Sequence, residues 1–404
     1  MDILIKTSKL KGKLNIPPSK SLSHRAVICA SLCKDGKSII NNLILSEDIK
    51  ATEQGMKQLT HNNHHPLIDC RESGSTLRFL IPISLVLNNQ CSFTGSSRLF
   101  ERPLDIYFDI FNEQNITYTT SEEIPLYIMG GLKAGTYKLS GKISSQFISG
   151  LLFALPMLSD DSEIIITDSL ESESYVYMTI DVIEKFGIMI EQINENKFYI
   201  KGNQNYISCT YTIEADYSQA SFFLVANELG NDIECIGLNE NSLQGDKEIV
   251  DIIKRYKNTE KEIIIDASQI PDLVPIISVL ASLKNRITTK IVNAERLRIK
   301  ESDRLKAIST EMKKIGADIN ETDDGLIING VEKLSGGAKV SSWNDHRIAM
   351  SLAIAATSCE REIILENYQS VNKSYPRFWD DYKYLGGKVN ELNNRQQNEN
   401  QLIR

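Results

Sequence analysis

The sequence lacks long apolar runs and an excess of positive charge. No apolar stretch approaches the roughly 20 residues that cross a bilayer, and no charged leader with an apolar run stands at the N-terminus, so we expect neither a membrane span nor a signal peptide. The net charge is −8, which argues against general binding of nucleic acid or membranes, because such binding needs an extended basic patch. Any anionic substrate must therefore be held by cations that the fold gathers in one place.

Paired cysteines and nucleotide-binding loops are missing as well. The seven cysteines, at positions 29, 33, 70, 91, 209, 235 and 359, form no CxxC pair and no cluster with histidine, which is typical of reduced thiols in the cytoplasm. The segment 61–65, HNNHH, has no carboxylate or thiol nearby, so a polar loop is favoured over a metal site. There is no GxGxxG and no Gly-Lys-Ser/Thr loop, so we expect no nucleotide cofactor.

What the chain does contain is a weak internal repeat. Its 404 residues exceed what one hydrophobic core usually supports, so two domains are the default expectation. Helix-like stretches end in Gly or Asn and lead into β-branched runs, as at Gly187, Gly316 and Gly386. Gly favours the left-handed backbone at a helix C-terminus, and β-branched residues favour a strand. Six such junctions, too far apart for a solenoid, predict six copies of a small α/β unit.

Four segments of the first half place hydroxyls, Gly and cations at the start of an apolar helix. They are Pro17–Arg25, Arg71–Arg78, Arg98–Pro103 and Ser144–Gln146. A helix N-terminus offers amide donors to an anion, and hydroxyls and cations strengthen that offer. Gly74 would let the backbone approach a small anion where a side chain would collide. Each segment alone is explained nearly as well by a capped helix with a solvated Lys and Arg.

The second half is richer in ionisable groups. Asp272 stands within the apolar run Ile270–Pro275, where it would suit a general base, although a helix-capping Asp explains it nearly as well. The run Arg296–Arg304 alternates in charge, which is typical of a solvated helix start. Trp343–Arg347 precedes a fully apolar helix, and Asn372–Pro376 ends the series.

Each plain explanation is credible alone, but their combination is not. Together the segments predict a site for several negative charges, built from cations at helix starts. These cations are Lys20, Arg25, Arg78, Arg102, Arg304, Arg347 and Lys373.

These segments resemble the 5-enolpyruvylshikimate-3-phosphate synthase family. The motifs PSKSxSxR, SGSTxR, ERP, SSQF, IPD, RxKESDR, NDHR and NKSYPxF occur in the family's order and span Lys11 to about Gly387. The resemblance implies an α/β (α+β) fold, the two-domain enolpyruvyl transferase fold. Each domain would have three similar βαβαββ-type units, six in all, with a hinge cleft between the domains. Residues 1–18 plus 215–390 would form domain I and residues 19–214 domain II, while 391–404 would be a frayed tail.

The resemblance also implies two sets of binding residues. Phosphoenolpyruvate would be bound by Lys20, Gly74, Arg78, Arg102, Gln146, Arg304, Arg347 and Lys373. Shikimate 3-phosphate would be bound by Lys20, Ser21, Arg25, Ser144, Ser145, Gln146, Ser172, Tyr175, Asp272 and Lys300.

The catalytic residues that the resemblance implies are Asp272, Glu301, Lys20, Lys373 and His346. Asp272 would accept the proton of the attacking hydroxyl, and Glu301 would deliver and later remove the proton at the methylene carbon. The reaction would form 5-enolpyruvylshikimate 3-phosphate and phosphate through a tetrahedral ketal, in the shikimate pathway to chorismate and the aromatic amino acids. It needs no metal and no organic cofactor, and the expected enzyme is a cytoplasmic monomer.

The chain departs from the family pattern in three places. Pro18 stands where Gly is common, Glu72-Ser73-Gly74-Ser75 replaces Asn-Ala-Gly-Thr, and Glu173-Ser174 replaces Lys-Pro. These differences bear on substrate affinity more than on the type of reaction. In the family, extra bulk at the position of Gly74 hinders the inhibitor glyphosate, so the resemblance implies a glyphosate-sensitive enzyme.

Two alternatives remain open at this stage. The related enolpyruvyl transferase for UDP-N-acetylglucosamine uses a loop with a reactive Cys, whereas the corresponding segment Gly95–Phe100 has none and Cys91 is predicted to lie in a strand. A non-catalytic phosphometabolite-binding protein on the same scaffold is the other alternative. The presence of Asp272, Glu301 and Lys373 argues against it.

Overall fold

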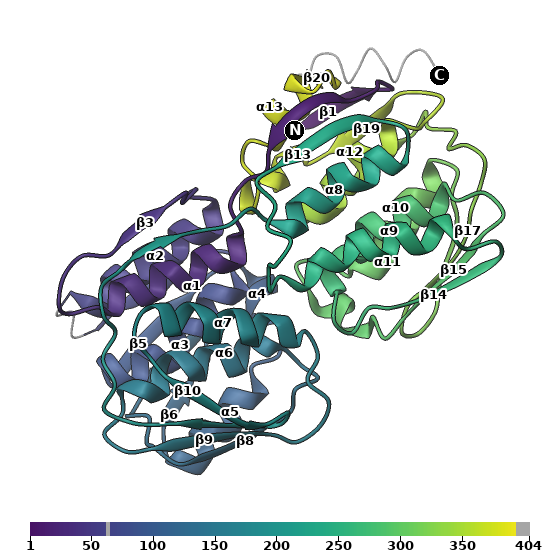
Figure 1. The fold of residues 1–404 in the computed structure, drawn as a ribbon. Helices are drawn as coiled ribbons and strands as arrows, with labels where there is room; N and C mark the ends of the chain where they lie inside the picture. The colour runs from purple at the N-terminus through teal and green to yellow at the C-terminus, as the bar shows by residue number, and fades with distance from the viewer. Residues whose placement is uncertain (62–64, 393–404) are drawn as a thin grey trace. The chain divides into compact units, whose positions relative to one another are not determined.

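The structure, a computed structural model, describes residues 1–61 and 65–392, and the chain divides into two compact units (Figure 1). Unit 1 combines Met1–Pro17 with the chain from Ala215 onward, and unit 2 is Pro18–Glu214. Each unit has a hydrophobic core of its own, because the two buried clusters share no residue. Most of the 61–65 loop and of the predicted frayed tail lies outside the described residues.

Four sheets repeat one strand pattern, in which the first two strands pair in parallel and the remaining pairs are antiparallel. In unit 2 they are β4 (Leu67–Asp69), β5 (Gln90–Thr94), β7 (Leu126–Met129), β6 (Thr117–Thr119), and β8 (Thr136–Leu139), β9 (Ser162–Ile166), β11 (Lys197–Ile200), β10 (Ile190–Asn194). In unit 1 they are β14 (Glu262–Asp266), β15 (Thr288–Val292), β17 (Leu326–Asn329), β16 (Asp318–Glu321), and β18 (Lys339–Ser341), β19 (Ile363–Glu366), β1 (Asp2–Lys6), β20 (Lys388–Leu392).

The first strand of the chain completes the last of these sheets. β1 takes the place that β7, β11 and β17 hold in the other three, and it pairs antiparallel with both β19 and β20. Two short parallel pairs complete the set, β2 (Lys11–Asn15) with β13 (Asp232–Ile236), and β3 (Ile39–Asn41) with β12 (Thr210–Thr212). In the described ranges each unit thus has three sheets, which confirms the prediction of six small α/β units.

Helices follow the strands in both units. In unit 2 they are α1 (Lys20–Leu32), α2 (Glu47–Thr60), α3 (Gly74–Leu87), α4 (Ser97–Phe100), α5 (Asp105–Gln114), α6 (Ser145–Ala154) and α7 (Glu173–Lys185), with the 3-10 turn η1 (Leu155–Met157). In unit 1 they are α8 (Tyr217–Glu228), α9 (Ile249–Lys257), α10 (Val274–Ser282), α11 (Arg304–Lys314), α12 (His346–Ala356) and α13 (Phe378–Tyr384). The 3-10 turns of unit 1 are η2 (Gly245–Glu248), η3 (Pro271–Leu273), η4 (Glu295–Ile299) and η5 (Tyr368–Lys373).

The helix-to-strand junctions are where the sequence predicts them. Gly187, Gly316 and Gly386 have positive φ angles of 82°, 100° and 95°, and Asn115 ends α5 in the left-handed conformation. These angles are strained for most L-residues but accessible to Gly and Asn. Four of the six predicted junctions are therefore confirmed as left-handed helix ends. The other two, after α9 and α2, end at Asn258 and His61 with φ angles of −107° and −103°, outside the left-handed region.

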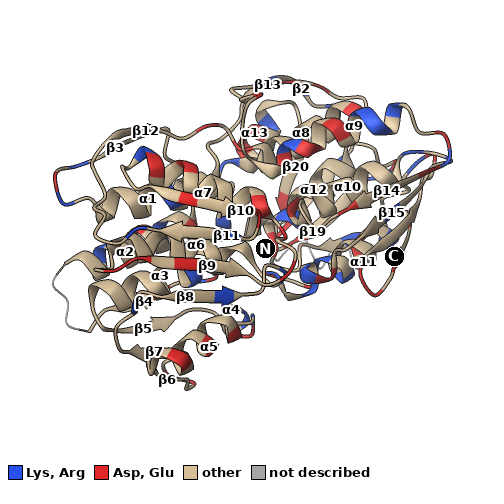
Figure 2. Cartoon of the chain, turned by 60° about the horizontal axis from the view of Figure 1, so that its bottom comes forward, with Lys and Arg blue, Asp and Glu red and all other residues tan. Residues whose placement is uncertain are grey.

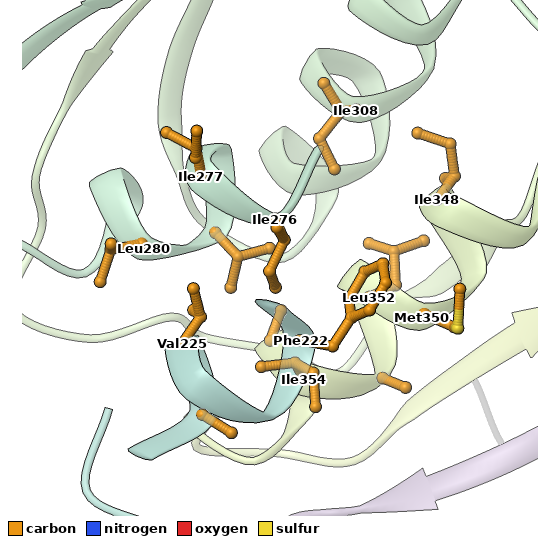
Figure 3. Packing of buried hydrophobic residues seen from close by; sticks show 14 of the residues in the cluster. Phe222, Val225, Ile276, Ile277, Leu280, Ile308, Ile348, Met350, Leu352 and Ile354 are labelled. Carbon is orange, nitrogen blue, oxygen red and sulfur yellow. The ribbon is translucent and has the colours of Figure 1, made fainter. Parts of the chain in front are cut away.

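Apolar helices fill the core of each unit. In unit 1, α8, α10 and α12 pack on one another, and Figure 3 shows Phe222, Ile276 and Leu352 from these three helices facing a common interior. The helices α6 and α10 carry no charged residue along their length (Figure 2), so burial of all their faces costs no desolvation of charge. None of the helices in the described ranges has both the length and the apolar character needed to cross a membrane.

Candidate active site

Many residues of the sequence motifs lie at the N-terminal ends of helices in the two units. In unit 2, α1 begins at Lys20, α3 at Gly74 and α6 at Ser145. Ser19, Ser73 and Ser144 cap them by accepting hydrogen bonds from backbone amides of the first turn, and Asp303 and Asp345 do the same for α11 and α12. The capped-helix interpretation is therefore correct, but the caps use residues next to the cations, and the cations have other partners.

In unit 1, Arg304 is held by three carboxylates. Its Nε donates to Oδ2 of Asp345 over 2.8 Å, its Nη1 to Oδ1 of Asp272 over 2.8 Å, and its Nη2 to Oε2 of Glu301 over 2.7 Å. The Arg304 side chain is only 2% exposed. Taken alone, the run Arg296–Arg304 is typical of a solvated helix start, but the structure does not show one. Arg296 and Arg304 are both buried, where Arg296 donates to the Ser268 carbonyl and Arg304 pairs with Asp345.

A second arginine reaches the same carboxyl group. Nη2 of Arg347 donates to Oδ2 of Asp272 over 2.9 Å, and Nη1 donates to the Ser218 hydroxyl over 2.6 Å and to the Asp272 carbonyl over 3.2 Å. Asp272 is thus paired through each of its carboxylate oxygens with a different arginine. Such charge-assisted bonds hold both guanidinium groups in fixed orientations.

These pairs determine the charge of the cluster. Burial by itself would raise the pKa of Asp272, but the positive charges of Arg347 and Arg304, with Lys300 behind them, outweigh it and hold that pKa well below its usual range. Burial opposes the charge of Arg304, yet Asp345, Glu301 and Asp272 together raise its pKa above the usual value. In this state Asp272 is charged and is a weak base.

The remaining predicted residues of unit 1 lie around this cluster. Lys373 donates a hydrogen bond to the carbonyl of Asn344, next to Asp345. His346 is buried at the start of α12, with Nδ1 3.9 Å from Oδ1 of Asp345. Lys300 precedes Glu301 and is near enough to Asp272 to lower its pKa. The structure therefore gathers Asp272, Glu301, Arg304 and Arg347 directly and places the other three beside them.

In unit 2, Arg25 joins α1 to α7. Nε donates to the Thr179 hydroxyl over 2.8 Å, Nη2 to the Tyr175 carbonyl over 2.7 Å, and Nη1 to the Ser21 carbonyl over 2.7 Å. Its guanidinium also lies over the Phe79 and Tyr175 rings, 5.3 and 6.0 Å from their centroids. Burial lowers the pKa of Arg25 to about 10, which leaves it charged at neutral pH.

A second group of unit 2 surrounds the start of α3. Nη1 of Arg78 donates to Oε1 of Gln146 over 3.3 Å, and Nε2 of Gln146 donates to the Ser75 hydroxyl over 2.9 Å. A Cβ on Gly74 would lie 2.6 Å from Nη1 of Arg102 and 2.9 Å from Nη1 of Arg78. Two guanidinium groups thus converge on a position that only glycine leaves open.

The Lys20 side chain is already paired with an acid. Its Nζ lies 3.0 Å from Oδ2 of Asp48, and both side chains are largely buried. Ser145 and Ser172 are buried near helix starts, and Ser172 has a positive φ of 54°. Asp48 was not among the predicted site residues.

Sequence reasoning also missed other partners. Asp345 lies inside the NDHR motif, was not selected, and is fully buried between Arg304 and the amide of Arg347. Ser218 accepts a hydrogen bond from Arg347, 129 residues away in the sequence, and Thr179 accepts one from Arg25, 154 residues away. Two consecutive residues with positive φ, Trp343 and Asn344, form the turn that presents Asp345. Asn tolerates this conformation, but Trp343 gives no sequence signal for it.

The described residues contain no group of three His, Cys, Asp or Glu side chains that could hold a metal ion. The three acids of the unit 1 cluster, Asp272, Glu301 and Asp345, are instead paired with arginine. Cys91, predicted to lie in a strand, is indeed in β5 and buried. Burial raises the pKa of its thiol to about 12, so it is not a reactive thiolate.

Comparison with known proteins connects this arrangement to one family. The family model described as EPSP synthase (3-phosphoshikimate 1-carboxyvinyltransferase) matches residues 4–382. A 3-phosphoshikimate 1-carboxyvinyltransferase of Clostridium perfringens strain 13 is 51% identical, covering 96% of this chain and 99% of that protein. The protein of the same name from Clostridium acetobutylicum is 52% identical, with 95% and 96% of the two chains covered.

Solved structures share the fold at lower sequence identity. EPSP synthase from Acinetobacter baumannii superimposes with a TM-score of 0.78 at 22% identity, covering 96% of this chain and all of that chain. The enolpyruvyl transferase NikO from Streptomyces tendae gives a TM-score of 0.74 at 15% identity, covering 96% and 98%. At these identities the likeness concerns the fold, the two-domain enolpyruvyl transferase fold.

Proposed function

We propose, on the premise that this chain belongs to the EPSP synthase family, that it transfers the enolpyruvyl group of phosphoenolpyruvate to the 5-hydroxyl of shikimate 3-phosphate. The products are 5-enolpyruvylshikimate 3-phosphate and phosphate, in the shikimate pathway to chorismate and the aromatic amino acids. The observation that carries the proposal is the cluster of unit 1, in which Asp272 and Glu301 are held by Arg304 and Arg347. The cluster supplies two groups that can exchange protons and two fixed cations.

In unit 1, Arg304 and Arg347 would bind the carboxylate and phosphate of phosphoenolpyruvate, with Lys373 beside them. Arginine suits this task, because its planar fork donates two parallel hydrogen bonds to an oxyanion. Their orientation is fixed in advance by the acids that they contact, so little reorganisation is needed when charge develops on the departing phosphate.

The residues of unit 2 would complete the binding of both substrates. Arg25, Ser21, Ser144, Ser145, Ser172 and Tyr175 would bind shikimate 3-phosphate. Lys20, Gly74, Arg78, Arg102 and Gln146 would bind phosphoenolpyruvate, and Lys20 and Gln146 would also contact the second substrate. The hydrogen bonds from Arg78 to Gln146 and from Gln146 to Ser75 support this assignment, because they hold a cation, an amide and a hydroxyl together in fixed orientations. The predicted hinge cleft and domain boundaries remain part of the proposal.

Glu301, as a carboxylic acid, would give its proton to the methylene carbon of phosphoenolpyruvate. The adjacent carbon then becomes oxocarbenium-like, the 5-hydroxyl attacks it, and Asp272 takes the hydroxyl proton to leave a tetrahedral ketal that still carries the carboxylate and the phosphate. Glu301, now a carboxylate, removes a proton from the new methyl group as the bond to phosphate breaks, which restores the double bond. Asp272 would give the hydroxyl proton to the departing phosphate, so both acids return to their starting states. Lys20, Lys373 and His346 would assist this charge separation, and no metal or organic cofactor enters the scheme.

Substrate binding would also make Asp272 a better base. In the ligand-free state, Arg347 and Arg304 hold the pKa of Asp272 well below its usual range despite burial. When the anion of phosphoenolpyruvate shares those arginines, its negative charge offsets their effect and raises the proton affinity of Asp272. The base would therefore become effective only when the substrate is present.

Phosphate release from phosphoenolpyruvate tests the proposal. Release is expected with shikimate 3-phosphate as acceptor and not with UDP-N-acetylglucosamine. Turnover with the UDP-sugar alone would replace this assignment by that of the related transferase, and no turnover with either would favour a binding protein. We further propose a cytoplasmic monomer, and size-exclusion chromatography with light scattering tests the oligomeric state.

A further inference from the structure

A buried carboxyl group next to the arginine cluster has no part in the reaction as proposed. Asp246 lies in η2 and is 4% exposed. Neither of its oxygens accepts a hydrogen bond from a described residue, although the Ser218 hydroxyl is close enough to favour its charged form. Buried acids normally have partners because an unpaired charge is costly away from water. A lone buried acid therefore requires an explanation.

The surroundings of Asp246 are fixed by the start of α8. Gln244 accepts a hydrogen bond from the Tyr217 amide over 3.0 Å and donates one to the Ala215 carbonyl over 2.8 Å, and η2 packs on α8 and α9. Ser218, the next residue of α8, accepts the 2.6 Å hydrogen bond from Arg347. Asp246 is thus held beside the residue that Arg347 contacts.

The charged groups that act on Asp246 come from several elements. Burial raises the pKa of Asp246 to about 7, and the charge of Asp272 adds to the increase, while Arg347 opposes it and Asp216 contributes a smaller increase. On α9, Asp251 and Lys254 are exposed and pair with each other over 2.9 Å. Asp246 and Asp272 therefore form a pair of unlike carboxyl groups, one that changes charge near neutral pH and one that stays charged.

We propose that Asp246 is a positioning residue for Arg347: uncharged, it leaves that arginine to Asp272 and phosphoenolpyruvate, and charged, it competes for it. The inference rests on the proposed function, because that function names the anion that Arg347 binds. A second negative charge beside Arg347 weakens its attraction for a substrate anion. Affinity for phosphoenolpyruvate should therefore fall as Asp246 ionises.

The test is the KM for phosphoenolpyruvate between pH 6 and 8, at saturating shikimate 3-phosphate, in wild type and Asp246→Asn. The wild-type KM is expected to rise by about tenfold relative to that of the variant over this range, the size of a one-unit interaction between titrating groups. Ionisation of the substrates affects both proteins equally, so the ratio isolates Asp246. Asp251→Asn, an exposed acid of the neighbouring helix, is the matched control and should follow wild type.

A KM ratio of wild type to Asp246→Asn that stays constant from pH 6 to 8 would overturn the proposal. So would a KM of Asp251→Asn that departs from wild type in the same way as that of Asp246→Asn. If circular dichroism shows that Asp246→Asn does not fold, Asp246→Ser takes its place, because it also removes the titrating group.

A measurement of thermal stability without substrates separates the inferred role of Asp246 from the proposed enolpyruvyl transfer. Because the acid form is favoured in the folded state, the wild-type melting temperature should fall relative to Asp246→Asn as pH rises from 5 to 7. Absence of wild-type turnover defeats the proposed function and with it this inference. Turnover with a flat KM ratio and parallel melting curves defeats the inference alone.

Discussion

Nη2 of Arg304 lies 2.7 Å from Oε2 of Glu301, three residues earlier in the chain. The group proposed to move the proton is thereby in direct contact with a cation proposed to bind phosphoenolpyruvate. Since Arg304 also contacts Asp272 and Asp345, its position depends on three acids, and replacing one of them leaves the other two in place.

Glu301→Gln should retain substrate binding and lose turnover. The amide oxygen can still accept the hydrogen bond from Arg304, but the amide cannot give a proton to carbon, so kcat should fall by about 10²–10⁴-fold while both KM values stay within about threefold. Steady-state kinetics by phosphate release measures both quantities. An unchanged kcat would exclude the proton role, and Glu321→Gln, which contacts Arg298 at the surface, is the control.

Gly74→Ala should weaken the binding of phosphoenolpyruvate. The new Cβ would lie 2.6 Å from Nη1 of Arg102, so both guanidinium groups near it must shift, and we expect KM to rise by about tenfold, or ~1.4 kcal/mol. Wild type should be inhibited by glyphosate and the variant less so. Gly36→Ala, where a Cβ meets only the Ser208 side chain at 3.1–3.8 Å, should behave like wild type; equal kinetics in Gly74→Ala would contradict the assignment.

Arg25→Lys should affect the other substrate. Lysine cannot reproduce three hydrogen bonds in the fixed directions of a guanidinium, so the Tyr175 carbonyl and the Thr179 hydroxyl each lose one hydrogen bond. The KM for shikimate 3-phosphate should increase by about tenfold and the free energy of unfolding fall by about 1–3 kcal/mol. The control is Arg377→Lys, because the Arg377 side chain is 70% exposed. If Arg25→Lys lost stability but kept normal kinetics, the role of Arg25 would be purely structural.

His24 should make the protein sensitive to mild acid. Burial, with help from Lys20 and Arg25, lowers its pKa well below the ordinary value, so the folded state keeps it neutral while the unfolded chain binds a proton near pH 6.5. The contribution of His24 to the free energy of unfolding should therefore fall as pH drops below about 6.5, by about 1.4 kcal/mol per pH unit. Urea unfolding at pH 7.5 and 5.5 tests this. The free energy of unfolding should decrease less on acidification in His24→Asn than in wild type or in the control His61→Asn, whose side chain is exposed. Equal decreases in the three proteins would refute the prediction.

The sequence predicts the fold where local chemistry decides it. Gly187, Gly316 and Gly386 mark the helix ends, and apolar runs after Lys20, Gly74 and Ser145 mark buried helices, because backbone preference and burial act over a few residues. Resemblance to a known family supplied the candidate site residues, and those of unit 1 lie close together in the structure.

Partners remote in sequence could not be predicted in this way. Arg347 contacts Ser218 across 129 residues, and Lys20 contacts Asp48 across 28. Asp246 stands in an ordinary polar turn, and its raised proton affinity comes from burial in the folded unit and from the nearby charge of Asp272. Charge pairing and desolvation depend on the assembled core, which a linear pattern does not specify.

The position of β1 between β19 and β20 also determines the order in which the chain can fold during synthesis. All strands of unit 2 have left the ribosome once residue 214 has emerged, so that unit can fold while the remainder is being made. The last sheet of unit 1 must wait for the final strands, and until then the first strand has exposed edges on both sides. The segment Asp2–Lys6, which is synthesised before the other described strands, is thus among the last to reach its native partners.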